Sequence, residues 1–402
     1  MNITDNTMAH IEFRLEWESE YAKHTEGFFG QEVNIWRDCF PKGFHDALMG
    51  ARIGDVVTLP CTPDETPSLR RSPNGVFTIK PAQFQRRFGD GHVLVPRAGR
   101  FYPKGVLKDI PNVFPANMEP FRCGRISENG ITVDFNHPLA GRELTIKAIV
   151  RDIWPKTKER GGVCHDWVER LMDGPGMQVR WNGLPTEFFD PDAFLRDDPS
   201  ADGDFYEKPR FVQHVDARAR EVIRELYSRL LKPGMQVLDL MASWESHLPT
   251  DLKPGRVVGL GLNQEELAAN PRLSQRVTRD LNATPTLPFA AAEFDAVLCT
   301  VSVEYLVHPH QVFAEIARVL KPEGLVVMTF SNRWFPTKAV KVWREIHEFE
   351  RLGLVMEYFL DQGRFHGLET YSMRGLPRPE DDKYYGTLWM SDPVYAAWGR
   401  RA

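Results

Sequence analysis

Apolar residues in the carboxy-terminal half of the chain gather in short runs that alternate with amphipathic stretches. Four of these runs have almost no polar position, at residues 236–240, 257–261, 296–301 and 325–330. Strands that are apolar on both faces are typical of a parallel sheet covered by helices. A helical spacing of apolar residues begins after Asp216, a favourable N-cap, and ends at 233–234. We therefore expect a doubly wound, Rossmann-like α/β domain over about residues 205–402.

The pattern after these runs predicts a long helix around Lys338–Leu352. The apolar run Leu354–Phe359 follows it and is expected to be a strand. Two further strands are expected at Glu369–Met373 and Val394–Trp398, where an antiparallel pair would close the sheet.

The amino-terminal part of the chain alternates apolar and polar residues, as half-buried strands do. The alternation is clearest from Ile11 to Trp17, and further strand signals lie at residues 56–59, 76–79, 131–133 and 144–146. Turn signals such as Ile53-Gly54-Asp55 separate them. We expect a β-rich α+β barrel domain over residues 11–153.

The two halves are separated by a segment with little periodicity. Residues 154–204 contain closely spaced glycines and the acidic stretch 197–204. They are expected to form a linker or an irregular wrapping segment. Because the periodicity breaks here, we expect independent cores, so that residues 1–155 would unfold cooperatively alone.

Composition and charge exclude several classes of protein. Of 402 residues, 42% are hydrophobic and 26% charged, which is ordinary for a globular chain. The net charge is −5 and no long basic run exists, so neither a nucleic-acid nor an anionic-membrane partner is expected. No apolar run approaches the ~20 residues of a spanning helix. The five cysteines are scattered, which indicates reduced thiols in a cytoplasmic protein.

One segment of the carboxy-terminal half carries a specific family resemblance. Phe294-Asp295-Ala296-Val297 leads through Val303-Glu304-Tyr305-Leu306 to Phe313–Gly324, and Leu287-Pro288-Phe289 precedes it. Together these motifs resemble the fourth strand, the next helix and the turn into the fifth strand of class I S-adenosylmethionine-dependent methyltransferases, of the methyltransferase-11-like kind. The resemblance covers about residues 205–402 and implies S-adenosylmethionine as the cofactor.

The corner that would face this cofactor departs from the family pattern. Family members follow the first-strand acid with glycines, which let the backbone approach the ligand closely. Here the turn after Asp239 holds no glycine and carries Trp244. Gly261 replaces the acidic residue that the family uses to bind the ribose hydroxyls. Two interpretations of Trp244 stay open: its ring stacks on the cofactor, or it fills the corner.

The resemblance also implies which side chains contact ligands. The cofactor-binding candidates are Asp239, Met241, Ser243, Trp244, Asn263, Asp280 and Asn282. The catalytic candidates, which would orient the acceptor or remove its proton, are His247, Glu304 and Tyr305. The substrate-binding candidates are Arg210, His214 and Arg333, where the arginines would hold an anionic group. His308 and His310 resemble a metal pair without a third ligand, so no metal is predicted.

The amino-terminal half resembles a second family. The run Asp134–Gly141, Asp-Phe-Asn-His-Pro-Leu-Ala-Gly, is similar to the closing segment of SlyD-like FKBP-type peptidyl-prolyl isomerases, and residues 43–55 resemble their pocket-floor helix. The resemblance implies an inserted flap at about residues 66–120. It places the apolar cradle for a proline peptide at Pro41, Gly43, Phe44, Phe135 and Leu139, with Trp17 in the place of a usual tyrosine.

The leading hypothesis is S-adenosylmethionine-dependent methyl transfer, with the FKBP-like domain recruiting or remodelling a protein or peptide substrate. One alternative is an active prolyl isomerase with a regulatory methyltransferase-like domain. Another is a binding protein in which both folds have lost catalysis. Trp244 separates the leading hypothesis from the last, because catalysis fails if its ring fills the cofactor corner.

Overall fold

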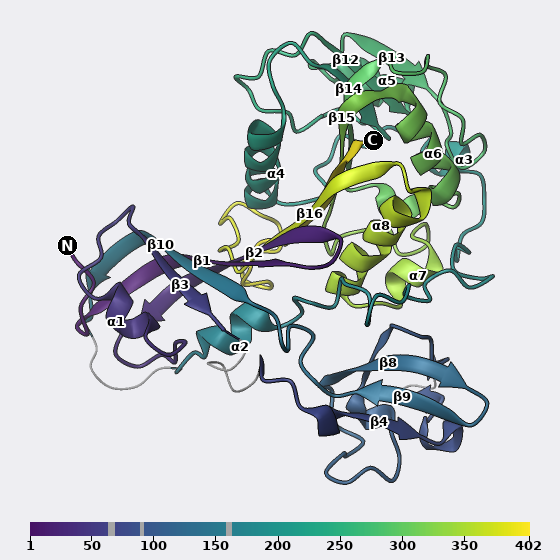
Figure 1. The fold of residues 1–402 in the computed structure, drawn as a ribbon. Helices are drawn as coiled ribbons and strands as arrows, with labels where there is room; N and C mark the ends of the chain where they lie inside the picture. The colour runs from purple at the N-terminus through teal and green to yellow at the C-terminus, as the bar shows by residue number, and fades with distance from the viewer. Residues whose placement is uncertain (63–68, 89–91, 158–162) are drawn as a thin grey trace.

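The computed structural model describes residues 1–62, 69–88, 92–157 and 163–402 (Figure 1). Seven strands of the carboxy-terminal half stand in the order β13 (Gln275–Thr278), β12 (Arg256–Gly261), β11 (Gln236–Leu240), β14 (Phe294–Thr300), β15 (Leu320–Phe330), β17 (Val394–Arg401) and β16 (Phe365–Arg374). The first five are parallel, and β17 is antiparallel to both of its neighbours. The expected doubly wound α/β fold is confirmed.

Helices cover both faces of these strands. α4 (Ala217–Leu230) packs on one face, and the carboxylate of Asp216 caps it by accepting the backbone N–H of Ala219, as the sequence predicts. α6 (Pro309–Val319) and α8 (Glu348–Gln362) cover the other face (Figure 1). No helix within the described ranges is long and apolar enough to span a lipid bilayer.

The helices and strands near the end of the chain differ from those expected. The run Leu354–Phe359, expected as a strand, continues this helix, and the expected long helix at 338–352 is reduced before it to the short α7 (Lys341–Arg344). His347 is the N-cap residue of α8, so this helix begins at Glu348. Because α8 is buried along most of its length, it lacks the polar face that would reveal a helical period.

The same sheet extends into the amino-terminal half. It continues beyond β16 with β2 (Ala22–Asn34), β1 (Thr7–Glu18), β10 (Leu144–Pro155) and β3 (Val56–Cys61), which gives eleven strands in all. These four strands pair antiparallel with one another. The helices α1 (Phe44–Leu48) and α2 (Trp167–Met172) share their hydrophobic core. The β-rich α+β character is as expected, but the strands belong to a shared sheet.

β2 and β16 join the two halves. The two strands run parallel, with Ala22–Phe28 in register with Leu368–Arg374. β2 therefore has β1 on one side and a strand of the carboxy-terminal half on the other. The hydrophobic core of residues 1–155 is a cluster of its own, but residues 167–179 complete it and one long edge of the unit pairs with β16. The independent unfolding of residues 1–155 stays a prediction.

An inserted unit lies between β3 and β10. Its sheet has the order β4 (Val76–Ile79), β9 (Gly130–Asp134), β8 (Pro120–Ser127) and β7 (Phe101–Pro103), and a two-stranded ribbon consists of β5 (Arg87–Phe88) and β6 (His92–Val93). The flap expected at 66–120 therefore extends to Asp134, while its expected first residues, 66–68, lie outside the described residues. It contacts α8, since Glu350 Oε1 accepts hydrogen bonds from Arg100 Nε and Phe101 N, each at 3.0 Å.

Residues 163–214, called the wrapping segment below, cross from the amino-terminal half onto the carboxy-terminal half. Arg180 pairs with Glu357 of α8 at 2.5 Å. Beyond it, the fully buried Lys338 donates from Nζ to the carbonyl of Ser200 at 2.8 Å, just before α3 (Asp202–Phe205). A buried cation with these partners fixes this part of the segment in place.

A fragment of residues 1–155 is expected to self-associate. Without β16, the outer edge of β2 exposes unpaired backbone N–H and C=O groups, and such an edge recruits other strands. Sedimentation velocity on the fragment should show oligomers or aggregate, while the full chain serves as the control. A monomeric fragment with a cooperative unfolding transition would contradict this expectation and restore the independent core.

Candidate functional site

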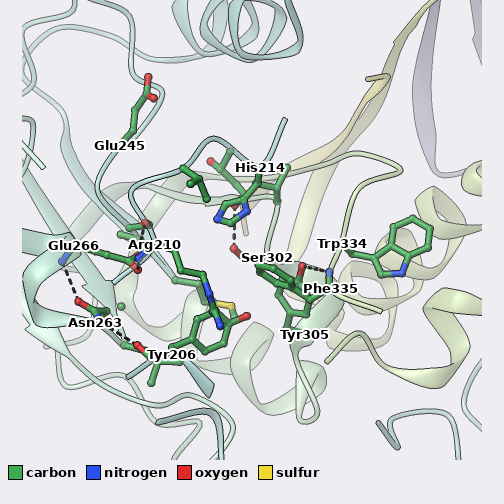
Figure 2. Close-up of a pocket in the computed structure, with 18 of the residues that line it drawn as sticks. Tyr206, Arg210, His214, Glu245, Asn263, Glu266, Ser302, Tyr305, Trp334 and Phe335 are labelled. Atoms are coloured by element: carbon green, nitrogen blue, oxygen red, sulfur yellow. Dashed lines mark hydrogen bonds between the residues drawn. The ribbon is translucent and has the colours of Figure 1, made fainter. Parts of the chain in front are cut away.

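A cavity of about 430 Å³ lies beyond the carboxyl ends of β11, β12 and β14 (Figure 2). β11 has β12 on one side and β14 on the other, so the strand order reverses here, where open α/β sheets bind their ligands. The volume is that of a small-molecule site. The wrapping segment and two carboxy-terminal loops complete the wall, with residues drawn from 202–214, 333–335 and 383–384.

Asp239 is the buried acid of this cavity. It stands on β11 with 3% of its surface exposed, and its Oδ2 atom has no hydrogen-bond partner among the described residues. Burial raises the pKa of Asp239 to about 7, while a hydrogen bond with Ser246 favours the charged form. A buried oxygen without a donor costs about 1–3 kcal/mol, so this position suits a ligand that donates a hydrogen bond.

The turn after Asp239 contains no glycine, although its backbone adopts conformations that glycine favours. Met241 and His247 adopt left-handed backbone conformations, with φ of 57° and 50°, and both line the cavity. Such conformations are uncommon for residues other than glycine and cluster at functional sites. A Cβ atom at Gly261 would lie 2.1 Å from the carbonyl oxygen of Ala242. This close crossing of two backbone segments explains why no acidic residue stands at Gly261.

An acidic side chain reaches this end of the cavity from α5 (Gln264–Ala269). Glu266 accepts hydrogen bonds from Ser243 Oγ at 2.6 Å and from the backbone N–H of Arg210 at 2.7 Å. Asn263 accepts the backbone N–H of Glu266 at 3.0 Å and donates to the wrapping segment (Figure 2). Ser243 and Asn263 line the cavity, but their side chains also hold its wall together. Sequence reasoning missed Glu266, although the Asn-x-x-Glu spacing of a capped helix is a signal for it.

Trp244 lies outside the cavity. Its Nε1 donates to the carbonyl of Val212 at 3.3 Å, and its ring centre is 6.4 Å from that of Phe211. Trp244 does not line the cavity, whereas Val212 does. The interpretation that Trp244 fills the corner is therefore not supported, because its ring packs against the wrapping segment outside the cavity. Its stacking on a bound cofactor stays a prediction.

Asp280 and Asn282 follow β13 and both line the cavity. Asn282 uses its whole amide in the wall, because Nδ2 donates to Asp202 Oδ2 at 2.7 Å and to the Tyr305 carbonyl at 2.8 Å, while Oδ1 accepts from the backbone of Val307. Asp280 accepts backbone N–H groups through Oδ1. Asp280 thus keeps its place as a cofactor-binding candidate, and Asn282 is a structural residue of the wall.

Two of the three catalytic candidates reach the cavity. His247 lines it, with Nδ1 3.5 Å from Glu245 Oε1. Interaction with the neighbouring His247 is the largest of the effects that hold the pKa of Glu245 well below its ordinary value. Tyr305 also lines the cavity, and its hydroxyl accepts the backbone N–H of Phe335 at 2.9 Å (Figure 2). Tyr305 therefore positions the loop that carries Phe335.

Glu304 does not line the cavity. Its side chain is in the core with 1% exposure, and neither carboxylate oxygen has a hydrogen-bond partner among the described residues. Burial raises the pKa of Glu304 to about 8, which Arg351 opposes electrostatically. The expected catalytic role of Glu304 is therefore not supported, because the short 3-10 helix Val303–Tyr305 that carries it buries its side chain in the core.

The three substrate-binding candidates come together from two distant segments. Arg210, His214 and Arg333 all line the cavity. The guanidinium of Arg210 lies 5.3 Å from the ring centre of Phe335, and the ring of His214 lies at the same distance from it. Burial lowers the pKa of His214 below its usual value, so its imidazole is neutral at pH 7 and able to accept a proton.

The apolar cradle expected in the amino-terminal half is not open. Phe44 and Leu139 have no exposed surface and belong to one core, which the wrapping segment completes with Trp167. Phe135 belongs to the separate core of the inserted unit. Gly43 precedes α1 with φ of 80°, a turn position that requires glycine. The substrate-binding assignment of these residues is therefore corrected, because they do not face one shared pocket.

Comparison with known proteins identifies similarities in both halves. Residues 244–328 match the family model of a methyltransferase domain, Methyltransf_11. The ubiquinone/menaquinone biosynthesis C-methyltransferase UbiE of Laribacter hongkongensis is 29% identical over 140 residues, which are 31% of this chain and 54% of that protein. The solved structure of YcgJ from Bacillus subtilis, 14% identical, covers 46% of this chain and 98% of its own, with a TM-score of 0.34.

The amino-terminal half has its own relatives. An FKBP-type 16 kDa peptidyl-prolyl cis-trans isomerase of Pseudomonas fluorescens is 31% identical over 111 residues, which are 28% of this chain and 64% of that protein. The chain thus spans between about half and two thirds of the length of the curated relatives it matches. Similarity to both families in one chain is consistent with a fusion of the two.

Glu304→Gln is expected to flatten the dependence of stability on pH. The pKa of Glu304 is about 8 in the folded chain and 4.5 for an ordinary glutamate, so the folded chain retains a proton that the unfolded chain releases. Stability therefore falls as pH rises through this window. Urea unfolding at about pH 5 and about pH 8 should show a smaller loss in the variant, by roughly 2 kcal/mol. Glu225→Gln, at an exposed position of α4, is the control, and equal losses in both variants would contradict the expectation.

The full chain is expected to leave prolyl isomerisation at its uncatalysed rate. A peptide could reach Phe44 and Leu139 only if α2 left the core that they share. A protease-coupled assay with a proline tetrapeptide measures this directly. The expectation is contradicted if the chain accelerates isomerisation and folded Phe44→Ala loses this acceleration. Phe114→Ala is the control, at a position 67% exposed, and should keep it. Such a result would show that the cradle opens. The core variant loses about 3 kcal/mol of stability, so its circular dichroism must be checked.

Proposed function

Because residues 244–328 carry a methyltransferase domain, we propose that the chain binds S-adenosylmethionine in the cavity beyond β11 and methylates an acceptor held beside it. The observation that carries this proposal is the unpartnered Oδ2 of Asp239, buried at the point where the strand order reverses. When bound, S-adenosylmethionine supplies a methyl group already activated on a sulfonium. The chain then needs mainly to orient the acceptor and to remove a proton.

The residues present fit this cofactor. Asp239 and Asp280 offer carboxylate oxygens to its hydroxyl and amino groups, and Glu266 brings a third carboxylate to the same cavity. A positively charged ligand is favoured beside these acids. Glu266 supplies the acidic side chain that the family carries at the position of Gly261. The end of β12 is too crowded for a side chain there, whereas α5 brings Glu266 to the cavity.

His214 is the residue best suited to remove a proton. Its lowered pKa keeps the imidazole neutral, and its ring is held against Phe335 at the cavity wall. Tyr305 fixes the same loop through its bond with the Phe335 backbone. His247 also lines the cavity, but it pairs with Glu245 and stands in the turn after β11. We therefore assign proton removal to His214 and a positioning role to His247.

The amino-terminal half supports the site from outside in this proposal. The cavity lining begins at Asp202, and no earlier residue that the structure describes contributes a side chain to it. The half covers the edge of β16 and provides the start of the wrapping segment. Recruitment of a protein or peptide substrate through the FKBP-like unit stays a prediction.

Calorimetric titration with S-adenosylhomocysteine tests the proposal. We expect micromolar binding, and Asp239→Asn should weaken it about tenfold or more because a charge-assisted hydrogen bond is lost. Asp295→Asn is the matched control, since Asp295 lies near the amino end of β14, away from the cavity at the carboxyl ends of the strands, and pairs with Lys321. If the wild-type chain does not bind at millimolar concentration, the non-enzymatic alternative replaces this proposal.

A further inference from the structure

We propose that the methyl acceptor is a small molecule in which a ring carries a carboxylate or phosphate group, and that Arg333 and Lys383 hold this anion at the cavity mouth. The inference rests on the proposed function and narrows its substrate class. It follows from which charges around the cavity already have partners, and from the kind of surface that lies between them.

Most acidic side chains of the cavity wall already form an ion pair or a hydrogen bond within the protein. Each has a partner at hydrogen-bond distance: Asp202 has Arg196 at 2.6 Å, Glu245 has Arg224 at 2.5 Å and Glu266 has Ser243 at 2.6 Å. Asp239 and Asp280 remain on the side where the cofactor is proposed to bind. No carboxylate of the cavity wall is therefore left to neutralise a cation near the mouth.

The cations at the mouth lack such partners. Arg333 and Lys383 line the cavity and form no ion pair with any carboxylate that the structure describes. The nearby Asp382 is occupied by Arg378, at 2.9 Å. Arg210 and Arg279 are further lining cations without an ion pair among the described residues. Arg210 donates to the Phe205 carbonyl at 2.8 Å, and Arg279 adjoins Asp280 on the cofactor side. Arg333 and Lys383 are thus two cations that no described carboxylate of the main cavity wall pairs with, and together they favour an anionic ligand.

The surface between these charges is aromatic. The guanidinium of Arg333 lies 4.4 Å from the ring centre of Tyr384, and the ammonium of Lys383 lies 4.9 Å from it. Figure 2 shows Tyr206, Tyr305 and Phe335 grouped beneath His214. Such rings provide flat apolar walls that pack well against a planar ligand. Acceptors without a ring would leave this surface in contact with water.

A second depression shows how the anion can remain near solvent. It shares His214, Arg333, Lys383 and Tyr384 with the main cavity and continues outward from them. Asp381 and Asp382 line the outer part of this depression, so the anionic group is expected to stay at the junction itself. There it meets two cations without full burial, which keeps its desolvation cost low. The ring then lies between this junction and His214, which is the residue assigned to proton removal.

The inference is tested by titrating the full chain with three probes that share one ring: benzoate, phenyl phosphate and benzyl alcohol. Titrations are run with and without saturating S-adenosylhomocysteine. We expect benzoate or phenyl phosphate to bind at least about tenfold more tightly than benzyl alcohol, and added salt to weaken the anions alone. The comparison of the two anions distinguishes a carboxylate from a phosphate site.

Variants locate the site. Arg333→Gln and Lys383→Gln should each weaken binding of the preferred anion several-fold, whereas Lys253→Gln, which removes the same charge at an exposed position away from the cavity, should not. Equal binding of benzyl alcohol, or anion binding that ignores both variants, overturns the inference. Failure of S-adenosylhomocysteine to bind overturns the proposed function instead, and the titrations without it still report on the anion site.

Discussion

The parallel pairing of β2 with β16 is the contact on which the rest of the structure depends. Without it, β16 would be the edge of the carboxy-terminal sheet, with unpaired backbone groups along one side. The pairing is marked by buried polar contacts: His24 Nδ1 lies 2.7 Å from Thr370 Oγ1, and Glu26 accepts a hydrogen bond from Ser372. Burial raises the pKa of Glu26 to about 7. Polar partners that must match across the seam specify its register, because a slip by one residue would leave them unsatisfied.

The shared sheet explains how a segment far from the cavity in sequence comes to form its wall. The wrapping segment begins in the amino-terminal core at Trp167, is held on α8 by Arg180, and reaches the cavity at Asp202. Its position is therefore determined by both halves. Asp202 pairs with Arg196 of the wrapping segment and with Lys338, which follows β15. These ion pairs connect the segment to the loop after β15.

Several features of the site could be predicted from the sequence because they depend on local pattern. The strands around the cavity are short apolar runs, and the side chains that follow a parallel strand gather at one edge of the sheet. For this reason Asp239, Asp280, Tyr305 and Arg333, which the sequence proposes as site residues, all line the cavity, while their roles stay predictions. The FKBP-like motif ending at Gly141 could also be recognised from the sequence. The sequence did not predict that Trp167 packs into the same core, because Trp167 belongs to a segment without periodicity.

The sequence by itself thus determined the doubly wound fold, the strand ends that meet at the cavity and the cap of α4, all of which follow from spacing and residue type. Only the tertiary structure decided that the halves share one sheet, that Glu304 points into the core and that Trp244 stands behind the wrapping segment. The physical reason is that the pairing of edge strands and the direction of a side chain at a strand end depend on residues distant in the chain. Periodicity records which positions are buried, but not which distant segment buries them.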